Sequence, residues 1–265
     1  MYSFVIPALN ESGRIGALLE DIAVRFPDAE RIVVDGGSRD DTVAEAMARA
    51  ATVLVSEPGR AKQMNLGAEA ATGAVLCFLH ADTKPLFDEA QLRSALPKDF
   101  GWSFCRITLR GQARALRLVA WFINHRSRLT SIATGDQLLM VNRDLFFDLG
   151  TFPELKLMED IELTSRLRRR QRAHPCDLNV ESSGRRWEQQ GVVATVVRMW
   201  ALRFAYWMGV SPDRLWEHYY GKHALEHGAE FADQPQNLSP DRSQRSTPSI
   251  RRRERVEDNE SGSAL

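Results

Sequence analysis

The fold is decided by the segment RIVVDGGSRDDT, residues 31–42. Its apolar, β-branched start predicts a buried strand over Arg31–Val34. Asp35 then precedes two glycines, and a helix is expected to start near Asp40. A strand that turns directly into a helix is the beginning of a βα unit. The segment therefore predicts an α/β fold, with free helix N-terminal amides beside the carboxylate of Asp35.

The sequence on both sides of this segment repeats the same unit up to about residue 80. Short β-branched runs alternate with stretches of helical periodicity. The expected strands are Tyr2–Ile6, Thr52–Ser56 and Ala74–Leu79, and the expected helices are Ile15–Phe26, Thr42–Ala50 and Ala61–Ala71. Such alternation indicates a parallel sheet covered by helices. Because parallel sheets bind ligands at the carboxyl ends of their strands, the loops that follow these strands are expected at one edge.

The alternation loosens beyond residue 100. We expect a strand near Trp102–Leu109, a long helix from about Gln112 to Ile132, a strand at Gln137–Val141 and a helix starting near Asp160. The fold class is therefore α/β, with a mostly parallel central sheet flanked by helices and a helical C-terminal extension.

The length of 265 residues suits one large domain, because single cores stop growing near about 250–300 residues. We expect a domain over residues 1–220, with a nucleotide-binding half at about 1–100 and an acceptor half at about 101–220. Residues 221–265 are expected to form a short extension and a disordered tail. From about Ala232 this segment is rich in Ser, Pro, Arg and Glu, with too few apolar residues to offset its ordering entropy.

The composition favours a globular protein and argues against nucleic acid as a partner. Basic and acidic residues are equal in number, 35 each, so no overall positive charge attracts a polyanion. The three cysteines, Cys77, Cys105 and Cys176, are far apart and lack the spacing of a zinc site. A reducing cytoplasm is the expected location, and the N-terminus shows no pattern of a secretion signal.

The most membrane-like stretch runs from Gly191 to Val210. Arg198 and Arg203 interrupt it, and each would cost roughly 2.5–3.5 kcal/mol at a bilayer centre. The stretch also carries aromatic residues that suit the headgroup region, so peripheral contact with the inner face of a membrane is one interpretation. A partly buried core helix is the other.

Asp35 is the first candidate functional residue. A carboxylate at a strand end can accept a hydrogen bond from a base N–H or a ribose hydroxyl, and the amides of the following helix attract phosphate. Gly37 and Ser38 lie in the same turn. The alternative is a tight βα turn capped by Ser38 or Asp40, which is a common structural feature.

Asp82 follows the buried strand Ala74–Leu79 in the segment His80-Ala81-Asp82. At the ligand edge of a sheet it could hold Mg²⁺ or Mn²⁺, ions that take one or two carboxylates and complete their shell with phosphate oxygens and water. The ion would neutralise charge on a departing nucleoside diphosphate. Alternatively, Asp82 only caps a turn.

Glu159 and Asp160 begin a helix that becomes strongly basic from Arg166 to Arg172. This polarity suits the helix dipole, so both acids could be purely structural. In the functional interpretation Asp160 is a general base that takes a proton from an acceptor hydroxyl, a role worth typically 10²–10⁴-fold in rate. Asp160 would then complete a ring of carboxylates with Asp35 and Asp82.

These elements together resemble family 2 glycosyltransferases. The ordered motifs that carry the resemblance are Val5-Ile6-Pro7-Ala8-Leu9-Asn10-Glu11, Val33 to Thr42, Gly59-Arg60 with Asn65 and Gly67, His80-Ala81-Asp82, and Glu159-Asp160. The resemblance covers about residues 1–220 and implies a GT-A fold with inverting transfer from a nucleotide sugar. More narrowly, the chain is similar to the bacterial radical-SAM/selenodomain-associated transferases.

The resemblance implies roles for individual residues. Asp35 would contact the base or ribose, Asp82 would be the metal-side acid of a D-x-D element, and Asp160 would be the base, with Glu159 beside it. The remaining residues implied to bind the nucleotide sugar are Pro7, Asn10, Glu11, Gly37, Ser38, Arg60, Asn65 and His80. Asp136 falls where relatives hold residues on the acceptor side.

The chain departs from the family pattern at two positions. His80 stands where the first acid of D-x-D is expected. Arg186-Trp187 resembles the end of a Q-x-x-R-W element, but Ser183 occupies the Gln position. Arg186 could still fork onto a diphosphate and Trp187 could stack on a sugar. Packing is the alternative role for Trp187.

The sequence thus predicts a metal-dependent inverting glycosyltransferase, hexosyltransferase-like, that acts on a hydroxyl of a small molecule, lipid or glycan. Two alternatives stay open. A sugar-phosphate nucleotidyltransferase would usually carry a Gly-rich, basic loop after the first strand, where this chain has Pro-Ala-Leu-Asn-Glu. A non-catalytic, membrane-associated protein would use the 191–210 helix. The sugar, the acceptor and the oligomeric state are not encoded in these motifs.

Overall fold

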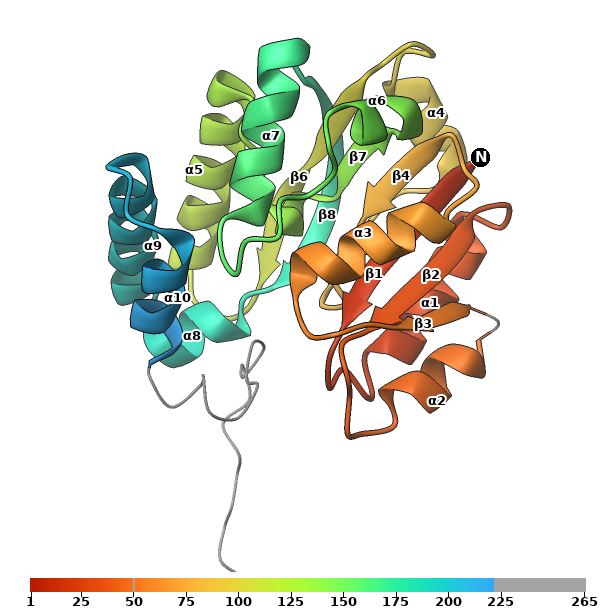
Figure 1. The fold of residues 1–265 in the computed structure, drawn as a ribbon, viewed down its shortest axis with the longest axis horizontal. Coiled ribbons are helices and arrows are strands. Elements are labelled where there is room, and N and C mark those ends of the chain that lie inside the picture. The colour runs from red at the N-terminus through yellow and green to blue at the C-terminus, as the bar shows by residue number, and fades with distance from the viewer. Residues whose placement is uncertain (50, 222–265) are drawn as a thin grey trace, which may run out of the picture. The chain divides into compact units, whose positions relative to one another are not determined.

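A computed structural model describes residues 1–49 and 51–221 of the chain, without the side chains of Arg186 and Tyr220. The expected tail, and all of the expected extension except Gly221, lie outside the described residues. Within them the chain forms an α/β fold around one mixed sheet in the order β3-β2-β1-β4-β7-β6-β8-β5 (Figure 1).

The elements follow one another along the chain as strands and helices in near alternation. The strands are β1 (Tyr2–Ala8), β2 (Glu30–Asp35), β3 (Thr52–Val55), β4 (Val75–Phe78), β5 (Thr83–Pro85), β6 (Trp102–Arg110), β7 (Leu139–Asn142) and β8 (His174–Ser183). The helices are α1 (Ile15–Arg25), α2 (Thr42–Met47), α3 (Arg60–Ala70), α4 (Glu89–Ala95), α5 (Ala115–Thr130), α6 (Arg143–Asp148), α7 (Glu159–Arg170), α8 (Arg185–Gln190), α9 (Val192–Trp207) and α10 (Pro212–Tyr220), with a 3₁₀ turn η1 (Gly135–Gln137).

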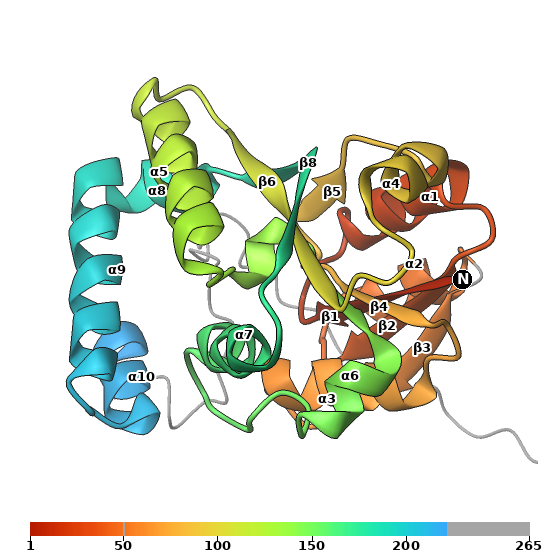
Figure 2. The same cartoon turned by 90° about the horizontal axis from the view of Figure 1, so that it is seen from above.

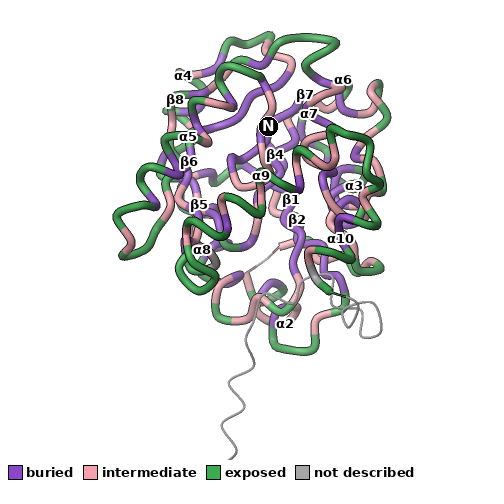
Figure 3. Tube along the Cα trace, turned by 90° about the vertical axis from the view of Figure 1, so that its left-hand side faces the viewer, coloured by how far each residue is buried: buried purple, intermediate pink, exposed green. Residues whose placement is uncertain are grey.

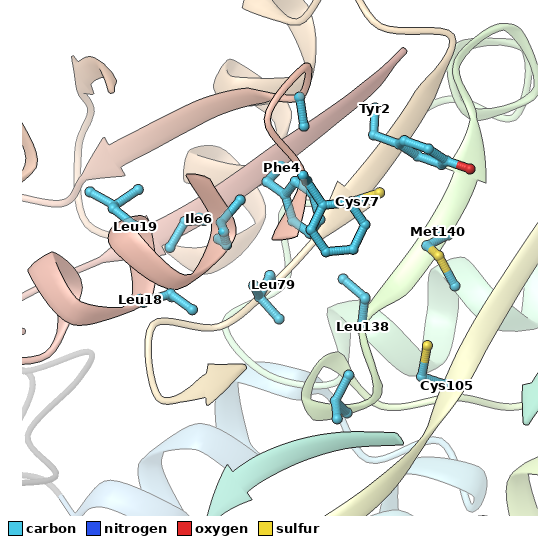
Figure 4. Close-up of a cluster of buried hydrophobic side chains, with 14 of the residues drawn as sticks. Tyr2, Phe4, Ile6, Leu18, Leu19, Cys77, Leu79, Cys105, Leu138 and Met140 are labelled. Carbon is cyan, nitrogen blue, oxygen red and sulfur yellow. The ribbon is translucent and has the colours of Figure 1, made fainter. Parts of the chain in front are cut away.

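The N-terminal half is the parallel α/β unit that the sequence predicts. β1 pairs in parallel with β2 and β4, and β2 pairs in parallel with β3. Alternate residues of a strand face opposite sides of the sheet. Phe4 and Ile6 therefore pack in the core with α1 (Figure 4), whereas Val5 packs with Met64 of α3. The helices lie on both faces of the sheet (Figure 2).

Gly67 explains how closely α3 approaches the sheet. A Cβ atom at this position would lie 2.4 Å from Cγ1 of Val5, so a larger residue would push the helix away. The buried face of α3 thereby holds the N-terminus of the helix, with Arg60, at the edge where β1, β2 and β4 end.

The second half is less parallel than the sequence predicts. β7 is antiparallel to both β4 and β6, β5 is antiparallel to β8, and only β6 and β8 pair in parallel. The apolar residues of a buried strand show that the strand is buried, but they do not show whether it runs parallel or antiparallel to its neighbour. The prediction also missed β5 and β8, and it placed Gln137 in a strand, whereas Gln137 belongs to η1.

The last part of the predicted 1–220 domain folds into α8, α9 and α10, ahead of the extension expected from residue 221. Leu202 of α9 and Leu215 of α10 form a small apolar cluster with Met158, which precedes α7. None of the helices in the described part of the chain is long and apolar enough to cross a membrane. The cluster fixes α9 and α10 beside the N-terminus of α7, where Asp160 lies.

Candidate active site

Asp35 ends β2 and is buried. Its Oδ2 accepts hydrogen bonds from the backbone N–H groups of Gly37 and Ser38, both at 2.9 Å, and its Oδ1 accepts one from the Ser38 hydroxyl. Gly37 has a φ of 96°, which glycine adopts without strain. A carboxylate offers about four acceptor positions. Three therefore hold the turn together, which leaves Asp35 about one further hydrogen bond for a ligand.

The loops after β1 and β2 are joined by hydrogen bonds between side chain and backbone. The Asn10 N–H donates to Ser38 Oγ at 2.9 Å, and the Arg39 N–H donates to Asn10 Oδ1 at 2.9 Å. The Glu11 N–H donates to Thr42 Oγ1 at 2.8 Å. These bonds bring Asn10 and Glu11 next to the Asp35 turn. Pro7, another predicted nucleotide contact, is buried within β1 opposite Val34.

Gln63 is a residue of this edge that the sequence reasoning missed. It lies fully buried on α3, and its Nε2 donates to the carbonyl oxygens of Ala8 at 3.0 Å and Val34 at 2.7 Å. It thereby ties the ends of β1 and β2 together. The available signal was a polar residue on the apolar face of a helix.

A second group of side chains meets around Gly135. The Gly135 N–H donates to Asp160 Oδ2 at 2.9 Å, and the Ile161 N–H donates to Asp160 Oδ1 at 2.7 Å. A Cβ atom on Gly135 would lie 2.4 Å from Nε2 of His80. The loop after β4, the turn η1 and the start of α7 therefore converge at one point, so the acid at the helix start also binds a distant loop.

Charges of the same sign act on one another in this group. Burial raises the pKa of Asp160, while its two backbone hydrogen bonds, Arg60 and Arg126 oppose the rise. Burial also raises the pKa of Asp136, the Thr134 hydroxyl and Arg126 oppose this, and the negative charges of Asp160 and Asp82 add to it. The predicted catalytic, acceptor-side and metal-side acids thus share one electrostatic environment.

His80 is half-buried between these groups. Burial and the positive charge of Arg60 lower its pKa to about 4, against the opposing effect of Asp82. The imidazole is therefore neutral at neutral pH and available as a hydrogen-bonding group or a ligand. Asp82 itself is exposed, with the Thr83 hydroxyl 3.2 Å from its Oδ1.

Arg60 and Glu159 connect this group to a cavity. Arg60 Nη1 lies 3.9 Å from Oε1 of Glu159, whose side chain is 6% exposed. Both residues line a cavity of about 90 Å³ together with Asp160. Its other walls come from the residue before η1, the start of α7, α9 and α10: Thr134, Leu157, Met158, Ile161, Met199, Leu202, Arg203 and Tyr219. A wider depression of about 460 Å³ lies between α3 and α6, lined by Glu69 and Arg143 among others, and none of the predicted site residues reaches it.

Two strained residues precede acids of the site. Asn10 has a φ of 54° and is followed by Glu11, and Met158 has a φ of 71° and is followed by Glu159. Non-glycine residues in the left-handed region cost free energy and cluster at functional sites. The tertiary structure holds both turns against this cost.

Three predicted residues lie apart from the two groups or are only partly described. Asn65 ties α3 to another loop: its Nδ2 donates to the Phe152 carbonyl at 2.9 Å and its Oδ1 accepts the Phe152 N–H at 3.0 Å. The backbone of Arg186 lies in α8, and its side chain is outside the described set. Trp187 is half-exposed on α8.

Helix α8 lies near the loop that follows β1, because the charge of Arg185 on α8 acts on the pKa of Glu11 in that loop.

The structure divides the predicted ring of carboxylates into two parts. Asp82, Asp136 and Asp160 belong to the group around Gly135, whereas Asp35 ends β2 on the far side of β1. Two strand spacings separate β2 from β4, about 10 Å. This arrangement suits an extended ligand that meets Asp35 at one end and the acidic group at the other.

The residues fit a metal ion that arrives with its substrate. Within the described ranges, no three His, Cys, Asp or Glu side chains are arranged to hold a metal between them. Asp82 nevertheless presents an exposed carboxylate beside a neutral imidazole. Mg²⁺ and Mn²⁺ often take one or two carboxylates, with phosphate oxygens and water as the other ligands. The donor set therefore suits a shared site rather than a closed cage.

Comparison with known proteins agrees with this geometry. Residues 3–95 match the family model "Glycosyl transferase family 2". A PGL/p-HBAD biosynthesis glycosyltransferase of Mycobacterium bovis is 38% identical over 90 residues, which cover 31% of this chain and 35% of that protein. The chain thus spans only about a third of the length of this curated relative.

Two solved structures share the fold. The mannosyltransferase PcManGT from Pyrobaculum calidifontis, in complex with GDP-Man and Mn²⁺, gives a TM-score of 0.53 at 19% identity, covering 68% of this chain and 56% of that one. Glucosyl-3-phosphoglycerate synthase from Mycobacterium tuberculosis, in complex with Mn²⁺ and UDP-glucose, gives 0.50 at 22%, covering 68% and 69%. The chain therefore has the GT-A fold, and its residues 3–95 are similar to glycosyl transferase family 2.

Proposed function

We propose that this protein is an inverting glycosyltransferase that moves a hexosyl group from a nucleotide sugar to an acceptor hydroxyl with a divalent metal. The observation that carries the proposal is the position of Asp160. Its carboxylate is held by the Gly135 and Ile161 N–H groups, its pKa is raised by burial, and it borders a cavity. A carboxylate whose pKa lies closer to neutrality is a stronger general base.

The nucleotide end of the donor would bind at the turn after β2. Asp35 has one acceptor position left for a base N–H or ribose hydroxyl, and the loops around Asn10 and Glu11 border it. The diphosphate would extend toward Asp82 and Arg60. A bound Mg²⁺ or Mn²⁺, with Asp82 as its protein ligand, would neutralise charge on the departing nucleoside diphosphate.

The acceptor hydroxyl would lie at Asp160, opposite the departing group. Asp160 takes its proton as the oxygen attacks the anomeric carbon, and the attack from the opposite side inverts the configuration. Arg126, which lies close enough to oppose the pKa rise of Asp136 and Asp160, limits the repulsion between these acids. Asp136 then faces the acceptor side.

Known structures support the class of donor and metal. PcManGT was solved with GDP-Man and Mn²⁺, and the glucosyl-3-phosphoglycerate synthase with UDP-glucose and Mn²⁺. We propose that this chain also binds a nucleotide sugar and a divalent metal. The sequence resemblance supports membership of the radical-SAM/selenodomain-associated subfamily, which we include in the proposal. The acceptor is a small molecule, a lipid or a glycan.

Asp160→Asn tests the proposal. The assay follows release of nucleoside diphosphate from UDP-glucose or GDP-mannose with Mn²⁺, with water as the acceptor, alongside thermal shift as a measure of donor binding. We expect turnover to fall about 10²–10⁴-fold with donor binding retained. Asp148→Asn, on the exposed side of α6, is the matched control and should leave both unchanged. Wild-type turnover in Asp160→Asn would show that Asp160 is not the base.

A second measurement separates the proposal from nucleotide transfer. A sugar-phosphate nucleotidyltransferase would consume a nucleoside triphosphate and a sugar phosphate and release pyrophosphate. We expect no pyrophosphate from that mixture, and its release would refute glycosyl transfer.

A further inference from the structure

The outward side of α9 is apolar. Its exposed apolar side chains recur at helical spacing: Val193, Val197, Trp200, Phe204 and Trp207. Trp200 is 69% exposed and Trp207 is 77% exposed, whereas Thr195 is buried on the inward side. A surface helix of a globular protein normally shows the opposite arrangement, with its apolar stripe facing the core. Much of this helix is exposed in the view of Figure 3.

Helix α5, which contacts α9, exposes apolar residues as well. They are Leu118, Trp121, Phe122 and Leu129. Trp121 packs against His125, with ring centroids 3.9 Å apart, so its indole is held at the surface. We call the exposed residues of both helices the α5–α9 surface. Many exposed apolar side chains on two helices in contact favour an interaction site over ordinary solvent-facing surface.

The charged side chains of α5 and α9 themselves are all basic, while the neighbouring Asp177 pairs with Arg128 and Glu188 accepts from the backbone of Gln112 and Ala113. Neither helix contains Asp or Glu, and Arg114, Arg117 and Arg198 are exposed on or beside them. Within the described residues, Arg114 and Arg117 make no ion pair, and Arg198 donates to Gln190 at 3.3 Å. The surface therefore combines tryptophan and aliphatic side chains with uncompensated positive charge.

We propose that the α5–α9 surface docks onto an anionic lipid bilayer. Tryptophan is enriched at the level of lipid headgroups, and exposed arginines are attracted to anionic lipid. The helix is too short and insufficiently apolar to cross a membrane, so it lies in the interface. A second copy of the chain would bring like charges together. Residues 222–265 are rich in Ser, Arg and Glu and supply few apolar side chains to cover the stripe.

Docking would also affect the candidate active site. Met199, Leu202 and Arg203 lie on α9 and line the cavity at Asp160. One helix therefore presents one side to the bilayer and another to the cavity. If the proposed function holds, the membrane and the cavity at Asp160 would lie on two sides of the same helix.

Vesicle flotation with the full-length protein tests the proposal. Vesicles of phosphatidylcholine alone are compared with vesicles that also contain phosphatidylglycerol. We expect binding to the anionic vesicles that salt weakens. Trp200→Ser with Trp207→Ser should reduce the partition coefficient by at least about tenfold. Arg114→Gln with Arg117→Gln should reduce the partition coefficient by roughly 30-fold, because each lost charge should reduce it by about fivefold. Val24→Ser, which changes an exposed residue of α1, is the matched control.

Thermal unfolding of each variant checks that the fold is retained, which we expect because the substituted side chains are exposed. Absence of binding to the anionic vesicles by the wild-type chain would overturn the proposal. Equal binding by the tryptophan variant and the wild type would also overturn it. If sedimentation showed instead that the wild type is a dimer and the tryptophan variant a monomer, the α5–α9 surface would be an interface between copies of the chain. The membrane proposal would then be wrong.

Discussion

Gly135→Ala is the sharpest test of how the candidate site is assembled. The φ of Gly135 lies outside the left-handed region, so the backbone itself accepts alanine. The added methyl would meet the His80 imidazole, with Nε2 at 2.4 Å and Cε1 at 2.6 Å. These distances are far below a van der Waals contact, so the imidazole or the η1 turn must move.

The size of the effect follows from these contacts. Gly135 and His80 are both half-buried, and overpacking of a packed position costs about 1–3 kcal/mol. A domain of this size loses about 2–4 °C of melting temperature per kcal/mol, so we expect a drop of roughly 2–12 °C without loss of the fold. The Gly135 N–H also holds Asp160 Oδ2, and a displacement of about 1 Å can cost 10²-fold in rate. Donor hydrolysis should therefore fall by about 10²-fold.

The assay is a double-mutant cycle. Thermal unfolding and release of nucleoside diphosphate are measured for the wild type, Gly135→Ala, His80→Ala and the double variant. Because His80→Ala removes the clashing ring, we expect a coupling free energy of about 1–3 kcal/mol in favour of the double variant. Additive effects, or an unchanged melting temperature in Gly135→Ala, would refute the packing of Gly135 against His80.

Three further predictions concern the acids. Asp136→Asn should raise the melting temperature at pH 7, because burial raises the pKa of Asp136 in the folded state and its charged carboxylate is therefore destabilising. Each kcal/mol gained in the free energy of unfolding would raise the melting temperature by about 2–4 °C. The stability that protonated Asp136 contributes is lost as the pH rises from its ordinary pKa of 3.8 through the raised pKa of the folded state. The higher melting temperature of Asp136→Asn should therefore disappear below pH 3.8, and a difference that persists below that pH would contradict burial of the charge as the cause. Asp35→Asn should fold but weaken nucleotide binding in calorimetry by roughly 10- to 100-fold. The side-chain amide of asparagine would leave the base N–H or ribose hydroxyl of the nucleotide without an acceptor, which costs about 1–3 kcal/mol. Unchanged affinity would exclude Asp35 from the nucleotide site. Turnover should fall on the acid side at a pH above the ordinary pKa of an aspartate, because Asp160 must be deprotonated and burial raises its pKa; a wild-type profile that stays flat down to 3.8 would argue against this base.

The N-terminal fold could be predicted from local pattern. The strands at residues 2, 30, 52 and 75 begin within a residue or two of their predicted positions, because each is a short apolar run bounded by turn residues. The turn at Asp35 follows equally from local chemistry, since its three hydrogen bonds all join residues 35, 37 and 38. Such contacts are encoded within a few positions of the chain.

The second half depended on long-range contacts. The direction of β7 and the pairing of β5 with β8 join segments that no local pattern relates. Gln63 and Arg126 also escaped the sequence reasoning, because a polar residue on an apolar helix face shows its partner only when the helix is packed.

By itself the sequence predicted the candidate site residues and determined the order of the elements in the N-terminal half that present several of them. Only the tertiary structure decided that Asp82, Asp136 and Asp160 share one environment around Gly135 while Asp35 lies across β1. The reason is that burial and Coulomb interactions depend on distance in space. Helix α9 makes the same point, since its apolar residues indicated a buried core helix or a membrane contact, and packing left the stripe exposed.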